Sequence, residues 1–336
     1  MSKPAVYVLS FFVLLLFALG VMGLGQGRRT GLAAARYPAE GRFVEVDGVS
    51  LHYEEAGRGK PVLLIHGSPG LTRDFKVVPP PDPEDGEQRL SLYQDLSRDH
   101  RVIAIDRPGH GWSGLDGGKG TGLLRQAELV AGFLKEIGAA PATVVGHSYG
   151  GSLTLAMAVE QPRSIEAAVI VGAPAYSDAF TPEPVETVGA RRVIGPVFNW
   201  TLGGAMAGRV IHDELTEAFA PHPIPEGYEE MFAIFVARPL NLYQRAYEVD
   251  RLPAELDRIS RHYSALDLPL TIVLGSVDSE GVRKSAIRLS DSFFGLLRVR
   301  NIRDLGHEVP HIEPEILAYE IRSVTKGARA AVAEGG

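Results

Sequence analysis

The chain has 336 residues, of which 45% are hydrophobic, so it can bury a large core as one domain with an additional smaller segment. It contains no cysteine, which excludes disulfides and thiolate metal sites. The net charge is −7, with +4 before Glu40 and −11 in the rest of the chain. An acidic domain without a basic patch argues against nucleic-acid binding. The ten histidines lack the spacing of a zinc site, and we expect neither a metal nor a cofactor.

Residues 1–36 form a segment of different composition. Residues 5–25 are almost wholly apolar and, as a helix, would span roughly 30 Å, the hydrocarbon thickness of a bilayer. A signal peptide usually has a shorter apolar stretch of about 7–15 residues, so we expect a retained single-pass membrane anchor. The alternative is export after cleavage near 33–35. Basic residues flank the stretch on both sides, so the charges favour neither orientation.

The next segments alternate like strands and helices of an α/β protein. Residues 43–46 and 51–53 alternate as an antiparallel edge pair around an Asp-Gly turn. Residues 61–65 are an apolar run typical of a buried parallel strand, ending at His66-Gly67. Residues 123–137 carry apolar positions at helical spacing, which predicts a crossover helix on the sheet.

Residues 146–150, Gly-His-Ser-Tyr-Gly, follow a strand-like run and open a helical run. A serine held in a strained strand-to-helix turn leaves no room for side chains two positions before or after it, so both positions are glycine. Ser148 would then stand at a helix N-terminus. The helix dipole and the N–H of Tyr149 would stabilise an oxyanion beside its hydroxyl, and the N–H of Ser68 could point at the same oxyanion.

Two further strand candidates end beside groups that complement a serine. Residues 270–275 precede Asp278, and residues 297–302 lead into Gly306-His307. Serine, acid and histidine therefore each follow a strand, in the order Ser, Asp, His.

On these segments, the chain resembles an α/β-hydrolase fold enzyme of the serine-nucleophile type from about residue 43 to about residue 326. The resemblance rests on the joint order of the stretches 66–70, 106–113, 146–150, 275–278, 306–307 and 313–315. It implies a mostly parallel sheet flanked by helices, with an inserted α-helical cap. We therefore expect a core of residues 37–177 and 264–327, a cap of residues 178–263 and a flexible tail of residues 328–336.

The resemblance implies a role for each residue of the site. Ser148 would attack an acyl carbon while His307 takes its proton, and Asp278 would orient the imidazole and stabilise the imidazolium. The backbone N–H groups of Ser68 and Tyr149 would receive the oxyanion.

Other residues of the sequence could fill the same roles. His311 lies four residues after His307 and is the alternative base, although the Gly-His turn after a strand favours His307. Asp267 precedes its strand, and Asp304 is too close in sequence to reach behind the ring. His66 is expected to be a structural histidine satisfied by backbone groups.

The serine at the elbow narrows the chemistry. Epoxide hydrolases and haloalkane dehalogenases of this fold carry Asp there, so we expect a carboxylesterase-like hydrolase acting on a small or medium apolar acyl substrate. The alternatives are a cofactor-free haloperoxidase, a carbon–carbon bond hydrolase, or a non-catalytic binding homologue. Aromatic residues of the cap either line an acyl pocket or pack between cap helices, and packing is favoured for most of them. They are Phe198, Trp200, Phe232, Phe235, Tyr243 and Tyr247.

Overall fold

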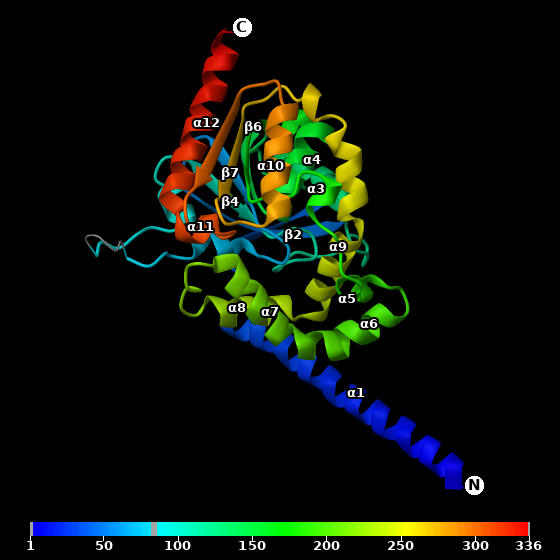
Figure 1. The fold of residues 1–336 in the computed structure, drawn as a ribbon. Helices are drawn as coiled ribbons and strands as arrows, with labels where there is room; N and C mark the ends of the chain where they lie inside the picture. The colour runs from blue at the N-terminus through cyan, green and yellow to red at the C-terminus, as the bar shows by residue number, and fades with distance from the viewer. Residues whose placement is uncertain (1–2, 82–85, 335–336) are drawn as a thin grey trace.

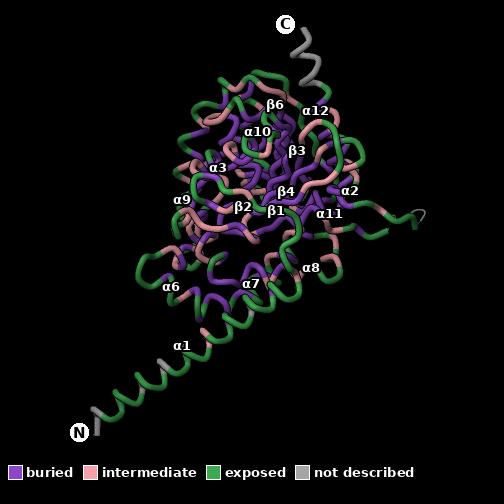
Figure 2. The backbone as a smooth tube through the Cα atoms, turned by 180° about the vertical axis from the view of Figure 1, so that it is seen from behind, coloured by how far each residue is buried: buried purple, intermediate pink, exposed green. Residues whose placement is uncertain are grey.

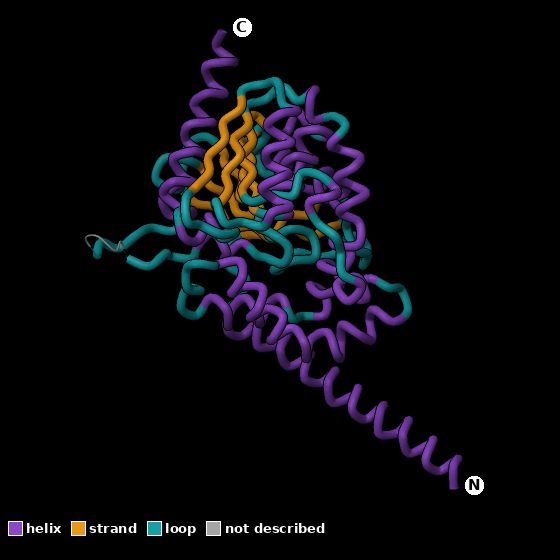
Figure 3. The backbone as a smooth tube through the Cα atoms, in the orientation of Figure 1, coloured by secondary structure: helices purple, strands orange, loops and turns teal. Residues whose placement is uncertain are grey.

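The computed structural model describes residues 3–81 and 86–334. Its strands form one eight-stranded sheet in the order β1-β2-β4-β3-β5-β6-β7-β8. Figure 3 shows the strands together, with helices around them. From β4 to β8 all neighbouring strands are parallel, whereas β2 pairs antiparallel with β1 and β4. The strands are β1 (Arg42–Val46), β2 (Val49–Ala56), β3 (Pro61–Ile65), β4 (Arg101–Ile105), β5 (Ala142–His147), β6 (Ile165–Val171), β7 (Leu270–Gly275) and β8 (Leu297–Ile302).

The central strands are buried on both faces, as their continuous apolar runs predict. Successive side chains of β3 point to opposite sides, because a strand has a period of two. Leu63 and Ile65 join the apolar cluster on one face, and Val62 and Leu64 join the cluster on the other.

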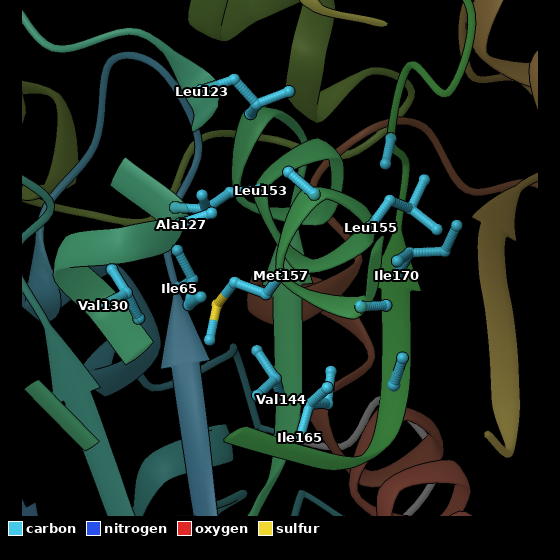
Figure 4. Close-up of a cluster of buried hydrophobic side chains, with 14 of the residues drawn as sticks. Ile65, Leu123, Ala127, Val130, Val144, Leu153, Leu155, Met157, Ile165 and Ile170 are labelled. Atoms are coloured by element: carbon cyan, nitrogen blue, oxygen red, sulfur yellow. The ribbon is translucent and has the colours of Figure 1, made fainter. Parts of the chain in front are cut away.

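Helices cover both faces of the sheet (Figure 1). One face carries α3 (Leu123–Glu136), α4 (Tyr149–Glu160) and α10 (Glu280–Ser292), whose apolar side chains pack on the strands (Figure 4). The other face carries α2 (Leu92–Leu96), α11 (Val309–Ile312) and α12 (Pro314–Glu334). Helix α12 continues into the expected tail, whose residues 335–336 lie outside the described part of the chain.

The segment between β6 and β7 is helical throughout its regular structure, and the described chain has no strand there. Most of its helices form a layer at the bottom of Figure 1, beyond the sheet, and the last of them rises from this layer to pack beside α3 and α4. They are α5 (Pro184–Thr187), α6 (Ile194–Phe198), the π-helical turn η5 (Asn199–Gly203), α7 (Gly204–Phe219), α8 (Tyr228–Val236) and α9 (Pro239–Ser260). We call α5 to α9 the cap. The sequence predicts a cap helix over residues 240–249, and α9 runs eleven residues beyond the expected end of that helix.

Helix α1 (Lys3–Arg36) has two different parts. Its N-terminal part projects away from the rest of the molecule with exposed side chains (Figures 1 and 2), whereas its C-terminal part packs on η5 and α8 of the cap. Gln26 is only 2% exposed and donates from Nε2 to the carbonyl oxygens of Asn199 (3.2 Å) and Ala237 (3.1 Å). The stretch Phe12–Arg36, with a mean hydropathy of 1.3, is long and apolar enough to cross a membrane, a property that a signal sequence shares.

Candidate active site

Ser148 occupies a sharp turn between β5 and α4. Its backbone lies at φ 53° and ψ −121°, in the positive-φ region that residues other than glycine rarely adopt. The Ser148 N–H donates to the carbonyl oxygen of Val171 at the end of β6 (2.8 Å). This bond ties the turn to the neighbouring strand and holds the serine at the carboxyl end of the sheet.

The two glycines of the motif are required by backbone contacts. A Cβ on Gly146 would lie 2.0 Å from the carbonyl oxygen of Gly150, and a Cβ on Gly150 would lie 2.3 Å from that of Ile65. Both distances are far shorter than atoms tolerate. The steric reason predicted from the sequence is therefore present at both positions.

His307 lies in the loop after β8, and its ring faces Asp278 in the loop after β7. The Nδ1 atom is 3.1 Å from Oδ1 and 3.2 Å from Oδ2 of Asp278. Burial alone would lower the pKa of His307, but the hydrogen bond and negative charge of Asp278, together with Glu308, raise it above its ordinary value of 6.5. Nδ1 therefore faces the carboxylate, and Nε2 is the nitrogen left for proton exchange.

A third glycine makes room for this pair. Gly172, which follows β6, has a φ of +55°, and a Cβ on it would lie 3.0 Å from Asp278 Oδ2 and 3.1 Å from His307 Nδ1. Any side chain at this position would press on both groups. The absence of a side chain at Gly172 therefore leaves room for the Asp278–His307 pair.

The loop after β3 approaches the serine from the other side. A Cβ on Gly67 would lie 3.1 Å from the Ser148 Cβ, so this loop lies directly against the nucleophile turn. Among the described residues, neither the Ser68 N–H nor the Tyr149 N–H donates to a backbone or side-chain acceptor. A backbone N–H without an acceptor is what an oxyanion donor requires, so both groups keep the role predicted for them.

Ser148 and His307 line the same cavity of about 180 Å³, which lies between the strand ends and the cap. Within the described chain no hydrogen bond joins the Ser148 hydroxyl to the His307 ring, and catalytic hydrogen bonds of unliganded enzymes are often long. The other polar or charged side chains that line the cavity are Ser68, Asp74, His147, Glu214, Tyr228, Arg245 and Glu308.

The rival residues lie elsewhere. His311 is buried between Phe219 and Tyr228, with Nδ1 2.8 Å from Glu308 Oε2, and it does not line the cavity. Asp304 is exposed, and Asp267 is exposed at the opposite end of the sheet, before β7.

His66 is satisfied by the backbone, as expected from the sequence. Its Nδ1 is 2.8 Å from the carbonyl oxygen of Gly67, and its Nε2 accepts from the N–H of Arg107 (3.0 Å). Burial, together with the Arg107 charge, holds the pKa of His66 well below its ordinary value, so the ring stays neutral.

Sequence reasoning missed a buried ionic network behind the loop after β3, because its members lie far apart in the chain and match no motif. Arg107 and Glu248 are both fully buried and pair at 2.5 Å between Nη1 and Oε1. Glu248, on α9, also accepts from Gln126 (2.8 Å), Gln244 (2.9 Å) and the Ser68 hydroxyl. The network ties a cap helix to the residue predicted to supply an oxyanion donor.

The sequence analysis also did not predict an ion pair in the cap. On α7 and α9, Arg245 forms a bidentate pair with Glu214, at 3.0 and 2.5 Å. Next to it, burial raises the pKa of Asp74 to about 7, whereas the pKa of Glu308 falls to about 2, because His147 and His311 outweigh the effect of burial.

The cap aromatics divide between the two expected roles. Phe232 lines the catalytic cavity, and Phe198 lines a separate cavity inside the cap. Phe235 packs edge-on against Trp112, and Tyr243 packs against Tyr247. Trp200 is 48% exposed, so it neither packs in a core nor lines the catalytic cavity.

Comparison with known proteins agrees with this architecture. The model of the family described as "Alpha/beta hydrolase family" matches residues 62–320. The dihydrolipoyllysine-residue acetyltransferase component of the acetoin cleaving system from Cupriavidus necator is 32% identical over 188 residues, which are 54% of this chain and 45% of that protein. The 2-hydroxy-6-oxo-2,4-heptadienoate hydrolase of Pseudomonas putida is 29% identical over 203 residues, which are 59% of this chain and 68% of that protein.

A solved structure shares nearly the whole fold. The crystal structure of a membrane phospholipase A, described as a bacterial virulence factor, matches with a TM-score of 0.60 at 20% identity. The match covers 96% of this chain and 98% of that one.

Proposed function

The chain belongs to the alpha/beta hydrolase family, and we propose that it acts as a serine hydrolase cleaving carboxylic esters through an acyl-enzyme. The observation that carries the proposal is the cavity shared by Ser148, on its strained turn, and His307, whose far ring nitrogen is held by Asp278. This combination supplies a nucleophile, a base and an orienting acid in one place.

The mechanism uses each group once in each half of the reaction. The Ser148 hydroxyl attacks the acyl carbon and passes its proton to His307 Nε2, while Asp278 stabilises the imidazolium. The Ser68 and Tyr149 N–H groups receive the oxyanion, a contribution of roughly 3–4 kcal/mol per donor. His307 then protonates the departing alcohol, and the same histidine activates the water that releases the acid.

The charges around the cavity favour a neutral ester over an anionic substrate. The second candidate reaction is carbon–carbon bond hydrolysis. It would take a substrate such as the one in the name of the Pseudomonas putida relative, a 2-hydroxy-6-oxo-2,4-heptadienoate, which carries a carboxylate. Among the described residues that line the cavity, Arg245 is the one arginine. It is paired with Glu214, and Glu308 keeps a negative charge because its pKa falls to about 2. Within this lining, a substrate carboxylate would meet no lysine or arginine without an acidic partner.

We further propose that helix α1 is retained as a membrane anchor. Gln26 and Ala33 are buried against the cap. Cleavage near residues 33–35 would therefore remove Gln26 and its hydrogen bonds and expose the cap residues that helix α1 covers. The projecting part, from Lys3 to Val21, is roughly 28 Å long at the helical rise, which is close to the thickness of a bilayer core. Intact mass measurement of the protein extracted from membranes tests this, and a mature protein beginning near residue 36 would contradict it.

Labelling with a fluorophosphonate tests the hydrolase proposal. The full chain in detergent should be modified at Ser148, and the label should vanish in Ser148→Ala and His307→Ala while persisting in Ser290→Ala, a control on α10 outside the site. The labelled protein is then assayed with short-chain esters and a 2-hydroxy-6-oxo-dienoate. Preference for the dienoate would support the second candidate, and a folded chain that neither labels nor turns over either substrate would refute both.

A further inference from the structure

The cap contains an apolar cavity that the proposed mechanism does not use. It measures about 110 Å³ and lies among α5, the turn η5, α7, α8 and α9. Its walls are mainly hydrophobic, with Val185, Phe198, Met206, Val210, Ile211 and Val236 among them. A hollow of this character suits a hydrocarbon group.

One ion pair forms the boundary between this cavity and the catalytic one. Glu214 and Arg245 line both cavities, and their bidentate contact joins α7 to α9. Each cavity alone is smaller than the roughly 300 Å³ at which ligand pockets typically begin, whereas the two together approach that size. Parting of the Glu214–Arg245 pair would make one continuous site.

The outer side of the cap cavity is unusually apolar for a surface. Val185, Met206 and Val210 line the cavity and are also exposed, at 55%, 45% and 42%. Val193, Ile194, Val197, Trp200 and Leu202, on α6, η5 and the residue preceding α6, add further exposed apolar side chains. An exposed apolar patch of this kind is typical of a surface that contacts a membrane, a ligand or another protein.

The position of helix α1 indicates that this surface contacts a membrane. It packs on η5, and Gly23 approaches the carbonyl oxygen of Trp200, so the exposed apolar part of α1 begins beside this surface. An anchor inserted in a bilayer from this point would bring the apolar side of the cap to the membrane.

We propose that the cap cavity is the acyl-chain site for a membrane-lipid ester, entered from the bilayer past Val210 and joined to the catalytic cavity when Glu214 and Arg245 separate. The inference rests on the proposed function, because it places the ester carbonyl at Ser148. It assigns the substrate class: an ester with a long acyl chain, taken from the bilayer.

Two alkyl fluorophosphonates test the acyl-chain site directly at Ser148. The full chain in detergent is labelled with the ethyl and the dodecyl reagent, and the ratio of the two rates is compared between variants. Val210→Trp and Met206→Trp should each lower the dodecyl-to-ethyl ratio by about tenfold, because the indole fills the cavity mouth. Ile287→Trp, at an exposed apolar position on α10 outside both cavities, should leave the ratio at the wild-type value.

The boundary pair has its own variant. Glu214→Gln should raise the dodecyl-to-ethyl ratio, because a neutral partner releases Arg245 more readily. Unchanged ratios in all three cap variants would overturn the acyl-chain site while leaving the hydrolase proposal intact. Absence of labelling by either reagent would instead refute the hydrolase proposal itself.

The bilayer origin of the chain is tested by fluorescence. The protein has two tryptophans, so Trp112→Phe leaves Trp200 as the single emitter. In phosphatidylcholine vesicles carrying bromine on their acyl chains, Trp200 emission should be quenched relative to unbrominated vesicles. Equal emission in both vesicle types would overturn entry from the membrane.

Discussion

The two sides of the Ser148 turn are built from different electrostatics. On the Arg107 side, the charges of Arg107 and Glu248 are fully buried and mutually compensated. Burial would raise the pKa of Glu248, but Arg107 and His110 hold it well below its ordinary value. On the His307 side, four titratable side chains line the cavity: Asp74, His147, His307 and Glu308. The pKa of Glu308 falls to about 2, that of Asp74 rises to about 7, and that of His307 rises above its ordinary value.

The difference shows how one site can hold its oxyanion turn in a fixed geometry and still keep groups that exchange protons. A compensated buried pair keeps its charges at all working pH values, so it can hold the Ser68 turn in one geometry. The His307 side keeps groups that exchange protons, because burial and neighbouring charges oppose one another there. The following predictions, from the largest expected effect to the smallest, separate the two sides.

Asp278→Asn should lower kcat by about 10⁴-fold, because an amide cannot hold the imidazole in the required tautomer. It should also move the acidic limb of the pH profile. His307 must be neutral to act as a base, so kcat/KM rises with pH through its pKa, which lies above 6.5 in the wild type and should fall in the variant. Asp304→Asn, at an exposed position, is the control, and an equal loss in both variants would contradict the assignment.

Arg107→Met should destabilise the fold by about 3–5 kcal/mol, because it leaves Glu248 buried without its cation. Urea unfolding of the full chain in detergent measures the change. Arg258→Met removes an exposed arginine and should cost less than about 1 kcal/mol. The double variant Arg107→Met/Glu248→Gln should recover part of the loss, and a single variant as stable as the wild type would show that the network is not needed.

Asp74→Asn should change the pH dependence of stability. The folded-state pKa of Asp74 is raised to about 7, so the native protein holds a proton that the unfolded chain loses near pH 4. Wild-type stability from this group is therefore complete below about pH 4 and falls as pH rises to about 7. The free energy of unfolding of the variant relative to the wild type should increase over that interval, by up to about 4 kcal/mol. A pH-independent difference would contradict the shift.

Ser68→Ala should have the smallest effect, about 1 kcal/mol of stability, because it deletes one hydroxyl donor to Glu248. The variant keeps the backbone N–H predicted for the oxyanion. Because the hydroxyl bond to Glu248 orients that N–H, we expect kcat to fall while KM stays close to the wild-type value. A rise in KM alone would mean that the hydroxyl acts in binding.

Much of the fold could be predicted because its signals are local. The family and the mostly parallel sheet followed from apolar runs and glycine turns, and the structure and family match confirm them. Element lengths were harder, since β2 extends to Ala56 and α9 runs past Pro253 to Ser260. Tertiary packing extends both elements, because their added residues pair with β4 or pack against the core.

The sequence by itself determined the chemistry that sits on single turns. Gly146 and Gly150 must be glycine because a Cβ at either position would lie 2.0 or 2.3 Å from a backbone carbonyl oxygen, and the five-residue motif around Ser148 makes that constraint readable from the sequence. Strand order likewise brought Asp278 and His307 to the same edge of the sheet. Only the tertiary structure decided what surrounds that edge. Arg107 meets Glu248, and Arg245 meets Glu214 beside a second cavity, because helices distant in the chain are pressed together over the strand ends. Charges buried by such contacts have no periodicity or motif, since their partners are chosen by packing in three dimensions.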